Sequence, residues 1–181
     1  FGFGYDGSSY VGMTNLVSNA GVVATDTAAV ATARGEFPAG CEYGGDKGIF
    51  GYGYVSGAVS MTNLVSNVGV VAADTTGVGT ARNGIAACSY GGDKGIFAYG
   101  YTSGAVSMSN LVSTAGVVAT DVTGVGTARY QLSGCEYGDG KGIFAYGFSA
   151  LSMSNLVSTA GVIGTDVTGV GTGRDALGAC S

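Results

Sequence analysis

The sequence predicts an all-β fold, a four-bladed β-propeller, and three observations carry that prediction. The string Met-Thr/Ser-Asn-Leu-Val-Ser occurs four times, starting at Met13, Met61, Met108 and Met153. The copies lie 45 to 48 residues apart, a period that signals a repeat architecture. Between them, apolar segments of strand length alternate with glycine-rich turns, and no segment has the 3.6-residue period of an amphipathic helix.

Each repeat contains four segments with the length and composition of β-strands. In the third repeat they are 85–90, 95–101, 106–113 and 116–122, and each is rich in β-branched, aromatic or small apolar residues. Glutamate, lysine and glutamine, which favour helices, are nearly absent from these segments. Every repeat therefore predicts four short strands.

Turn-forming residues separate the four segments. Residues 91–95, Gly-Gly-Asp-Lys-Gly, join the first segment to the second, and a variant recurs at 138–142. Glycine and aspartate adopt the positive φ that tight hairpins need. The links at 102–104 and 113–116 also contain glycine, so we expect successive strands to be antiparallel neighbours.

Four short antiparallel strands per repeat are typical of a propeller blade. Blades pack face to face, which buries both faces of each sheet and suits strands rich in glycine, alanine and valine. We expect a single domain over residues 1–181. Its repeats are 1–34, 35–82, 83–129 and 130–174, and residues 175–181 complete the first blade.

The two ends of the chain match parts of one blade. Residues 1–5 match the second strand at 50–54, and residues 177–181 match the first strand at 85–89. The hairpin tip of seven residues between them would bring the length to four periods of 47. We expect the terminal strands to pair and close a ring without open edges. A fragment of a larger propeller and a β-solenoid are the alternatives.

Composition narrows the classes of function. The chain has 7 basic and 12 acidic residues and no basic patch, so we expect no nucleic-acid partner. No run of 18 apolar residues exists, so we expect no membrane insertion. The chain starts at Phe1 without a visible signal peptide, which fits a processed amino terminus or a window cut from a longer chain.

One stretch resembles a kelch-type repeat: Arg82, Ile85-Ala86-Ala87, and Tyr-Gly-Gly-Asp-Lys-Gly-Ile-Phe-Ala-Tyr-Gly at 90–100. In that family an arginine precedes the inner strand, and a hairpin leads to a hydrophobic strand ending in a glycine pair. Here the pair becomes Gly-Tyr or Tyr-Gly, and the family's tryptophan is absent. The repeated Asn-Leu-Val-Ser and Gly-Asp-Lys-Gly-Ile-Phe strings are also similar to repeats of environmental phage structural and tail-fibre-like proteins. That resemblance implies a display or attachment role.

Cysteine occupies the same place in every repeat, in the strand that a propeller places innermost: Cys41, Cys88, Cys135 and Cys180. Three interpretations remain open. Each cysteine is a small buried residue in place of alanine, or two disulfides join strands whose Cα atoms lie about 4.4–6.8 Å apart, or four thiolates surround one metal ion at about 2.3 Å. The first interpretation, a small buried residue, is favoured, and we expect no metal and no cofactor.

Aspartate and arginine also recur at a fixed spacing of eight residues: Asp26 and Arg34, Asp74 and Arg82, Asp121 and Arg129, Asp166 and Arg174. An arginine offers five donors and can hold several carbonyl groups at once. We expect a structural ion pair or a cap on the loop between blades rather than a ring of ligand sites.

Two further sets of residues are candidates for binding. The predicted hairpin tips carry all three lysines: Asp46, Lys47, Asp93, Lys94, Asp139 and Lys141. We interpret them as solvated turns, with a partner-binding face as the alternative. Aromatic residues alternate with small ones in the second strands: Tyr52, Tyr54, Tyr99, Tyr101, Tyr146 and Phe148. Contact between blades is their expected use, and stacking on sugar rings is the alternative.

Catalysis has little support, because the chain has no histidine and no repeated pair of carboxylates set for glycoside hydrolysis. We expect a non-enzymatic structural or display module, either extracellular or part of a virion, such as a tail-fibre, decoration or attachment protein. Its expected partners are other structural proteins or copies of itself. The alternative function is a secreted carbohydrate-binding propeller with one site per blade, in which repetition supplies avidity for surface glycans.

Overall fold

The computed structural model describes residues 1–180 and contains eleven strands in four antiparallel sheets. Sheet 1 consists of β1 (Gly2–Tyr5) and β2 (Tyr10–Thr14). Sheet 2 consists of β3 (Ala39–Tyr43), β4 (Lys47–Gly51) and β5 (Thr62–Val65). Sheet 3 consists of β6 (Ala86–Tyr90), β7 (Lys94–Tyr101) and β8 (Ala105–Val112). Sheet 4 consists of β9 (Ser133–Tyr137), β10 (Lys141–Gly147) and β11 (Leu151–Val157).

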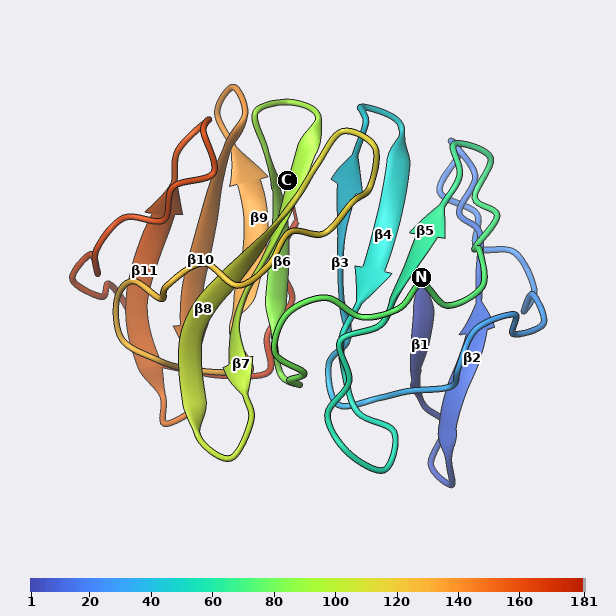
Figure 1. Cartoon of the computed structure of the whole chain (residues 1–181), viewed down its shortest axis with the longest axis horizontal. Coiled ribbons are helices and arrows are strands. Elements are labelled where there is room, and N and C mark those ends of the chain that lie inside the picture. Colours follow the sequence, from blue (N-terminus) through green and yellow to red (C-terminus); the bar gives the residue numbers. More distant parts are fainter. Residues whose placement is uncertain (181) are drawn as a thin grey trace.

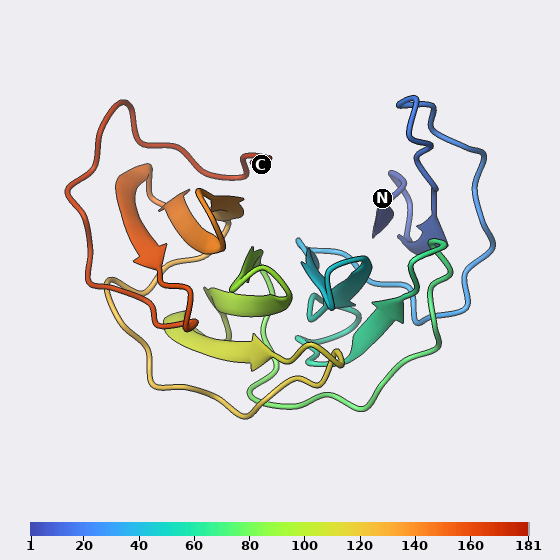
Figure 2. The same ribbon diagram turned by 90° about the horizontal axis from the view of Figure 1, so that it is seen from above.

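The four sheets follow one another around an open arc (Figure 1; Figure 2). We call each sheet together with the rest of its repeat a unit, so units 1 to 4 are residues 1–34, 35–82, 83–129 and 130–174. Sheet 1 and sheet 4 lie at its two ends, and a gap separates them in the view from above. Within the arc, the inner strand β3 neighbours β6, and β6 neighbours β9. The hairpins β3–β4, β6–β7 and β9–β10 point to one side of the arc, the top in Figure 1.

The prediction of an all-β fold is confirmed, and in the third repeat the first three strands lie close to their predicted ranges. The fourth strand is wrong as predicted: the outer segment of each unit is held by isolated bridges, such as Val112↔Val118 and Ser109↔Val122, instead of a continuous ladder. The reason is an asparagine in the third strand. Asn110 Nδ2 donates to the carbonyl of Ala119 at 3.0 Å, and so a side chain takes an acceptor that the neighbouring strand would otherwise use.

Closure of the ring is not observed. β1 pairs with β2 on one side, and residues 175–180 form no strand in the described part of the chain. Sheet 1 consequently has two strands where the other sheets have three. The closed four-bladed ring stays a prediction.

Hydrophobic residues of neighbouring sheets meet at the junctions between units, where they form the core. Phe97, Tyr52 and Ile49 are at most 1% exposed between sheets 2 and 3, and Phe144, Tyr99 and Ile96 fill the same place between sheets 3 and 4. The rings pack edge to face, with centroids of Tyr52 and Phe97 5.2 Å apart. No helix long and apolar enough to cross a membrane occurs in residues 1–180.

Candidate functional site

Each junction between units is held by the same set of polar side chains, which we call the arginine clamp. At the junction of units 2 and 3, Arg82 donates from Nη2 to Asn110 Oδ1 at 2.6 Å, from Nη1 to the Thr80 carbonyl at 3.0 Å, and from Nε to the Tyr99 carbonyl at 2.8 Å. Its guanidinium lies over the Tyr52 ring at 4.4 Å. Arg82 and Asn110 are fully buried.

An aspartate completes the clamp from the outer segment. Asp121 accepts from Asn110 Nδ2 at 3.0 Å and from the backbone N–H and hydroxyl of Thr80, and it lies 3.8 Å from Arg82. Burial raises the pKa of Asp121, but the hydrogen bonds from Thr80 and Asn110 and the charge of Arg82 outweigh it, so the pKa falls below its usual value. The carboxylate thus acts mainly as a hydrogen-bond acceptor between units.

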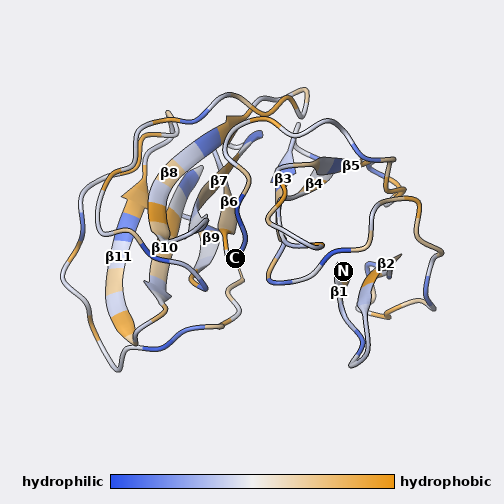
Figure 3. Cartoon of the chain, turned by 60° about the horizontal axis from the view of Figure 1, so that its bottom comes forward, coloured by the Kyte–Doolittle hydropathy of each residue, from blue (hydrophilic) through white to orange (hydrophobic). Residues whose placement is uncertain are grey.

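The clamp recurs at three junctions. Its members at the other two are Arg34, Thr32, Phe3, Asn63 and Asp74, and Arg129, Thr127, Tyr99, Asn155 and Asp166. Burial lowers the pKa of Arg34 to about 10, against the opposing effect of Asp74. Figure 3 shows the consequence for the sheets: hydrophilic bands cross β8 and β11, the strands that contribute Asn110 and Asn155.

The structure corrects how aspartate and arginine are paired. The eight-residue spacing joins Asp74 to Arg82 in the sequence, but the ion pairs run between units, from Arg34 to Asp74 and from Arg82 to Asp121. The expected structural role, a cap on the connection between units, agrees with this geometry. Sequence reasoning missed the asparagine, although a polar residue repeated in the middle of an apolar strand was a visible signal.

A strained backbone positions the aromatic partner of each arginine. Phe3, Tyr52, Tyr99 and Tyr146 all have positive φ, between 62° and 66°. The strand pairing shifts register at Tyr99 and Tyr146, as in a β-bulge. With this backbone conformation the rings of Tyr52 and Tyr99 lie under the guanidinium groups of Arg82 and Arg129 and are fully buried, so they serve packing.

The four cysteines are free in the structure. Cys41 Sγ lies against Gly95 of the next unit, where an added Cβ would come within 2.5 Å of it, and Cys88 meets Gly142 in the same way. Burial raises the pKa of Cys41 to about 12 and also raises that of Cys88. The geometry therefore makes Cys41 and Cys88 small packing residues between units, whereas Cys135 is half-buried and Cys180 is exposed. No group of three or more His, Cys, Asp or Glu side chains that could hold a metal ion occurs within residues 1–180.

The hairpin tips form a row along the top of the arc. Lys94 pairs with its neighbour Asp93 at 2.7 Å, and Lys47 pairs with Asp46 at 3.2 Å. The tips also touch one another, because the Gly44 N–H donates to the Asp93 carbonyl at 2.7 Å. Asp139 and Lys141 occupy the same place in unit 4. Lys47 and Lys94 thus each neutralise the aspartate beside them.

At the opposite, lower rim of the arc, residues of units 2, 3 and 4 line a pocket of about 390 Å³. Tyr101 and Tyr130 form an aromatic wall, with ring centroids 5.0 Å apart, and Tyr130 stacks on Phe148 at 4.6 Å. Polar groups face this wall: Glu36, Asn83 and Gln131 line the pocket, and the Glu36 carboxylate accepts from Asn83 and from the Tyr10 hydroxyl. Tyr54 belongs to a second cluster at this rim, with Tyr10 at 6.2 Å.

The residues of this pocket are those in which the repeats differ most. Between the clamp arginine and the cysteine, the repeats read Gly-Glu-Phe-Pro-Ala-Gly, Asn-Gly-Ile-Ala-Ala, Tyr-Gln-Leu-Ser-Gly and Asp-Ala-Leu-Gly-Ala. The backbone there is nonetheless regular, because Gly84 N–H donates to the Glu36 carbonyl and Gln131 N–H donates to the Gly84 carbonyl. A constant framework therefore presents variable side chains at the lower rim. Sequence reasoning passed over this contrast, although the aligned repeats contain it.

These features define a class, a repetitive all-β protein with a buried polar clamp at each junction. Comparisons with family models and with curated proteins find no match, so the fold and the site geometry carry the functional argument.

Proposed function

We propose that the protein is a non-enzymatic display module, whose stiff arc presents the variable lower rim to a partner. The observation that carries this proposal is the contrast between constant residues at the junctions and variable residues at the lower rim. The arginines and asparagines of the three clamps repeat unchanged and are buried, whereas the residues around Glu36, Asn83 and Gln131 differ between repeats and line a pocket.

A virion-associated or extracellular setting is part of this proposal. The resemblance to kelch-type repeats and to phage tail-fibre-like repeats supports it, as does the scarcity of charged side chains, 10% of the residues, which suits a scaffold that packs repeat against repeat. Partners would be structural proteins of the particle or receptor molecules on a host surface. A ring of four blades closed by the chain's own termini is the finer form of the propeller prediction.

A second candidate function is binding of surface glycans, and the pocket at the lower rim favours it. Aromatic walls with a few convergent polar groups are typical of small-ligand sites. Tyr101 is 37% exposed and Phe148 45% exposed, so the ring surface that does not pack on Tyr130 is open to a sugar ring. A carboxylate and two amides beside them supply donors and acceptors for hydroxyl groups.

A glycan array and an association assay with particles test both candidates. The double variant Tyr101→Ala/Tyr130→Ala removes the aromatic wall, and Lys94→Ala, at the opposite rim, is the matched control. Sugar binding that the double variant loses and Lys94→Ala keeps supports the glycan site. Association with particles or filaments without sugar binding supports the structural role. If neither occurs with a folded protein, the display proposal fails.

A further inference from the structure

Unit 2 has one residue more than units 3 and 4 between the clamp arginine and the cysteine. Cys41 follows Arg34 by seven positions, whereas the corresponding spacing in units 3 and 4 is six. The backbone bonds from Gln131 to Gly84 and from Gly84 to Glu36 join equivalent positions, whose φ values are 54°, 59° and 52°. The additional residue therefore comes directly after Glu36, and it is Phe37.

The additional residue places an aromatic ring at the pocket of the lower rim. Phe37 is 46% exposed, so it lies outside the cores at the junctions, and it lines the pocket together with Tyr101 and Tyr130. Its φ is 59°, and two successive residues other than glycine thus have a left-handed backbone. Such conformations are unfavourable for residues with a Cβ and gather at binding sites. This pocket is where an extra, exposed phenylalanine has a use.

The three rings that line the pocket come from three units. Phe37 belongs to unit 2, Tyr101 to unit 3 and Tyr130 to unit 4. The planes of Tyr101 and Tyr130 are inclined by 55°, and Phe148 stacks on Tyr130 with centroids 4.6 Å apart. Two inclined rings form a corner instead of a flat platform. A rounded group can contact both walls of a corner at once, whereas a flat sugar ring stacks on one.

A single negative charge accompanies these rings. Of the described residues that line the pocket, Glu36 alone is charged. Its carboxylate accepts from the Tyr10 hydroxyl at 3.2 Å and from Asn83 Nδ2, and both donors are neutral, so they orient the carboxylate without cancelling its charge. The three lysines lie at the hairpin tips of the opposite rim (Figure 1). A positive charge at this pocket must therefore come from the ligand.

Aromatic rings beside a carboxylate favour an organic cation. The quadrupole of a ring attracts a cation that lies within about 6 Å of its centroid, and quaternary ammonium groups are ligands of this kind. A primary ammonium group has three donors that each need an acceptor, whereas a trimethylammonium group has none. Both oxygens of Glu36 already accept a hydrogen bond. The pocket thus suits a methylated ammonium group better than a primary one.

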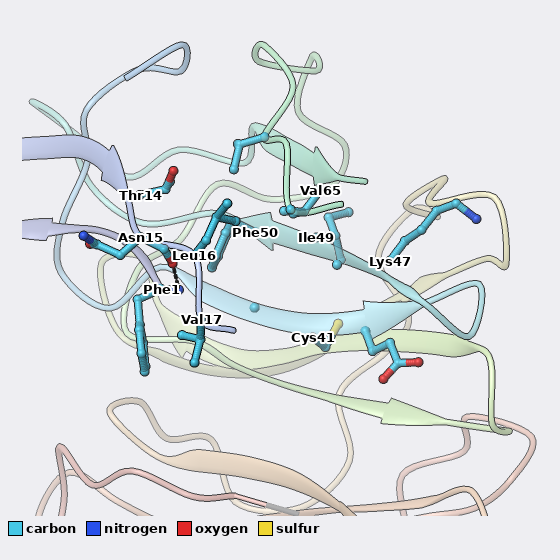
Figure 4. Close-up of a pocket in the computed structure, with 15 residues that line it drawn as sticks. Phe1, Thr14, Asn15, Leu16, Val17, Cys41, Lys47, Ile49, Phe50 and Val65 are labelled. Carbon is cyan, nitrogen blue, oxygen red and sulfur yellow. Dashed lines mark hydrogen bonds between the residues drawn. The ribbon is translucent and has the colours of Figure 1, made fainter. Parts of the chain in front are cut away.

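The larger cavity between sheets 1 and 2 does not have this combination (Figure 4). Its volume is about 570 Å³, and aliphatic side chains such as Leu16, Val17 and Ile49 form much of its wall. Its charged residues, Glu42 and Lys47, have opposite signs. An excess of negative charge beside several rings is therefore a property of the lower-rim pocket, whose volume of about 390 Å³ is in the range of small-ligand sites.

We propose that the lower-rim pocket binds a quaternary ammonium group, such as the choline head group, among Phe37, Tyr101 and Tyr130, with Glu36 as the counter-charge. This inference rests on the proposal that the lower rim is the binding face, and it narrows the ligand to a cation. Glycine and glutamine stand in units 3 and 4 where unit 2 has Glu36, and neither unit has the additional phenylalanine. Residues 35–174 therefore provide one such site instead of one per unit.

Calorimetric titration of the wild-type protein tests the role of charge. The two ligands are choline chloride and its neutral carbon analogue, in which a tert-butyl group of the same shape replaces the trimethylammonium group. We expect choline to bind and the analogue to bind about 10-fold more weakly. Added salt should weaken only the binding of choline, because salt screens the attraction to Glu36. Equal affinity for the two ligands, or no binding of choline, would overturn the ammonium site.

Single substitutions locate the site on the surface. Phe37→Ala, Tyr101→Ala and Glu36→Gln should each weaken choline binding about 5- to 30-fold. Tyr137→Ala is the matched control and should bind normally: Tyr137 is 38% exposed and Tyr101 37%, but Tyr137 ends β9 at the opposite rim. All four side chains are exposed, so the circular dichroism spectrum should stay that of the wild type. Unchanged affinity in the three pocket variants would contradict the proposal.

A glycan array separates this inference from the proposed function. Glycan binding that Tyr101→Ala/Tyr130→Ala abolishes, in a protein that does not bind choline, would keep the lower rim as the binding face and reject the ammonium site. Phosphocholine on a soluble carrier and phosphatidylcholine vesicles then distinguish the two sources of the head group. Binding to either one that free choline displaces supports the site and assigns its source, a surface polymer for the carrier and a lipid for the vesicles.

Discussion

Removing the asparagine at the centre of a clamp should destabilise the protein far more inside the arc than at its end. The change is Asn110→Ala, and the matched control is Asn15→Ala. Asn110 accepts from the buried Arg82 at 2.6 Å and donates to Asp121 and to the Ala119 carbonyl, each at 3.0 Å. Asn15 makes the two equivalent donations but receives no arginine.

The magnitude follows from the state in which each variant leaves its neighbours. Asn110→Ala leaves a fully buried guanidinium without its closest acceptor, and a buried charge that loses its partner costs about 3–5 kcal/mol. Asn15→Ala removes two half-exposed hydrogen bonds whose partners water can reach, which costs about 1 kcal/mol or less. The difference of about 2–4 kcal/mol corresponds to a gap in melting temperature of roughly 5–15 °C for a chain of this size.

Urea unfolding at low protein concentration, followed by circular dichroism, measures both variants against the wild type. Because repeat proteins can unfold unit by unit, the slope of the transition is compared as well as its midpoint. Equal losses of stability in Asn110→Ala and Asn15→Ala, within about 0.5 kcal/mol, would refute the clamp as the source of junction stability.

Three further predictions concern single residues. The pKa of Asp121 is lowered in the folded protein, so its contribution to stability is complete above the pKa of the unfolded chain, about 4, and is lost as the pH falls through the folded pKa. Asp121→Asn should therefore reduce the loss of stability at acid pH, and an unchanged dependence of stability on pH would contradict this. The exposed Cys180 should react with a thiol reagent at pH 8 well before Cys88, because burial raises the pKa of Cys88. Equal labelling rates of the two thiols, followed by intact mass, would contradict the assignment of Cys88 as an interface residue. Gly95→Ala should cost about 1–3 kcal/mol by overpacking, whereas Gly104→Ala, with nothing within 4 Å, should cost far less in the same melts.

Strand positions were predictable from sequence because local chemistry decides them. The Gly-Gly-Asp-Lys-Gly strings fix the hairpins through glycines with positive φ at 91 and 92, and the β-branched and aromatic runs beside them have no competing helical pattern. The outer segment was overpredicted as a strand. Its composition suits a strand, but a side-chain amide from the neighbouring strand takes one of its carbonyl groups.

The polar clamp was only half predictable. The fixed spacing of Asp and Arg predicts that they pair. It cannot tell whether the pair forms within one repeat or between two, because Asp74 and Asp121 occupy equivalent positions in neighbouring repeats. The bulge at Tyr99 was equally hidden, because a tyrosine with a φ of 62° has no local sequence signature. Ring closure could not be decided either, because it depends on curvature, which accumulates from small rotations at every junction.

The arrangement of buried and variable residues explains how such uniform repeats could serve recognition. A repeat protein is stabilised by its intrinsic units and by its nearest-neighbour interfaces, so every junction must keep its clamp. Arg82 and Asn110 cannot change without cost, because each leaves the other buried and unpaired. The lower rim has no such constraint: its backbone bonds run from Gln131 to Gly84 and on to Glu36, whatever the side chains are. Side chains there can diverge while the arc persists, and the segments between the clamp arginine and the cysteine differ strongly from repeat to repeat. The place to seek a partner is therefore the pocket beside Tyr101.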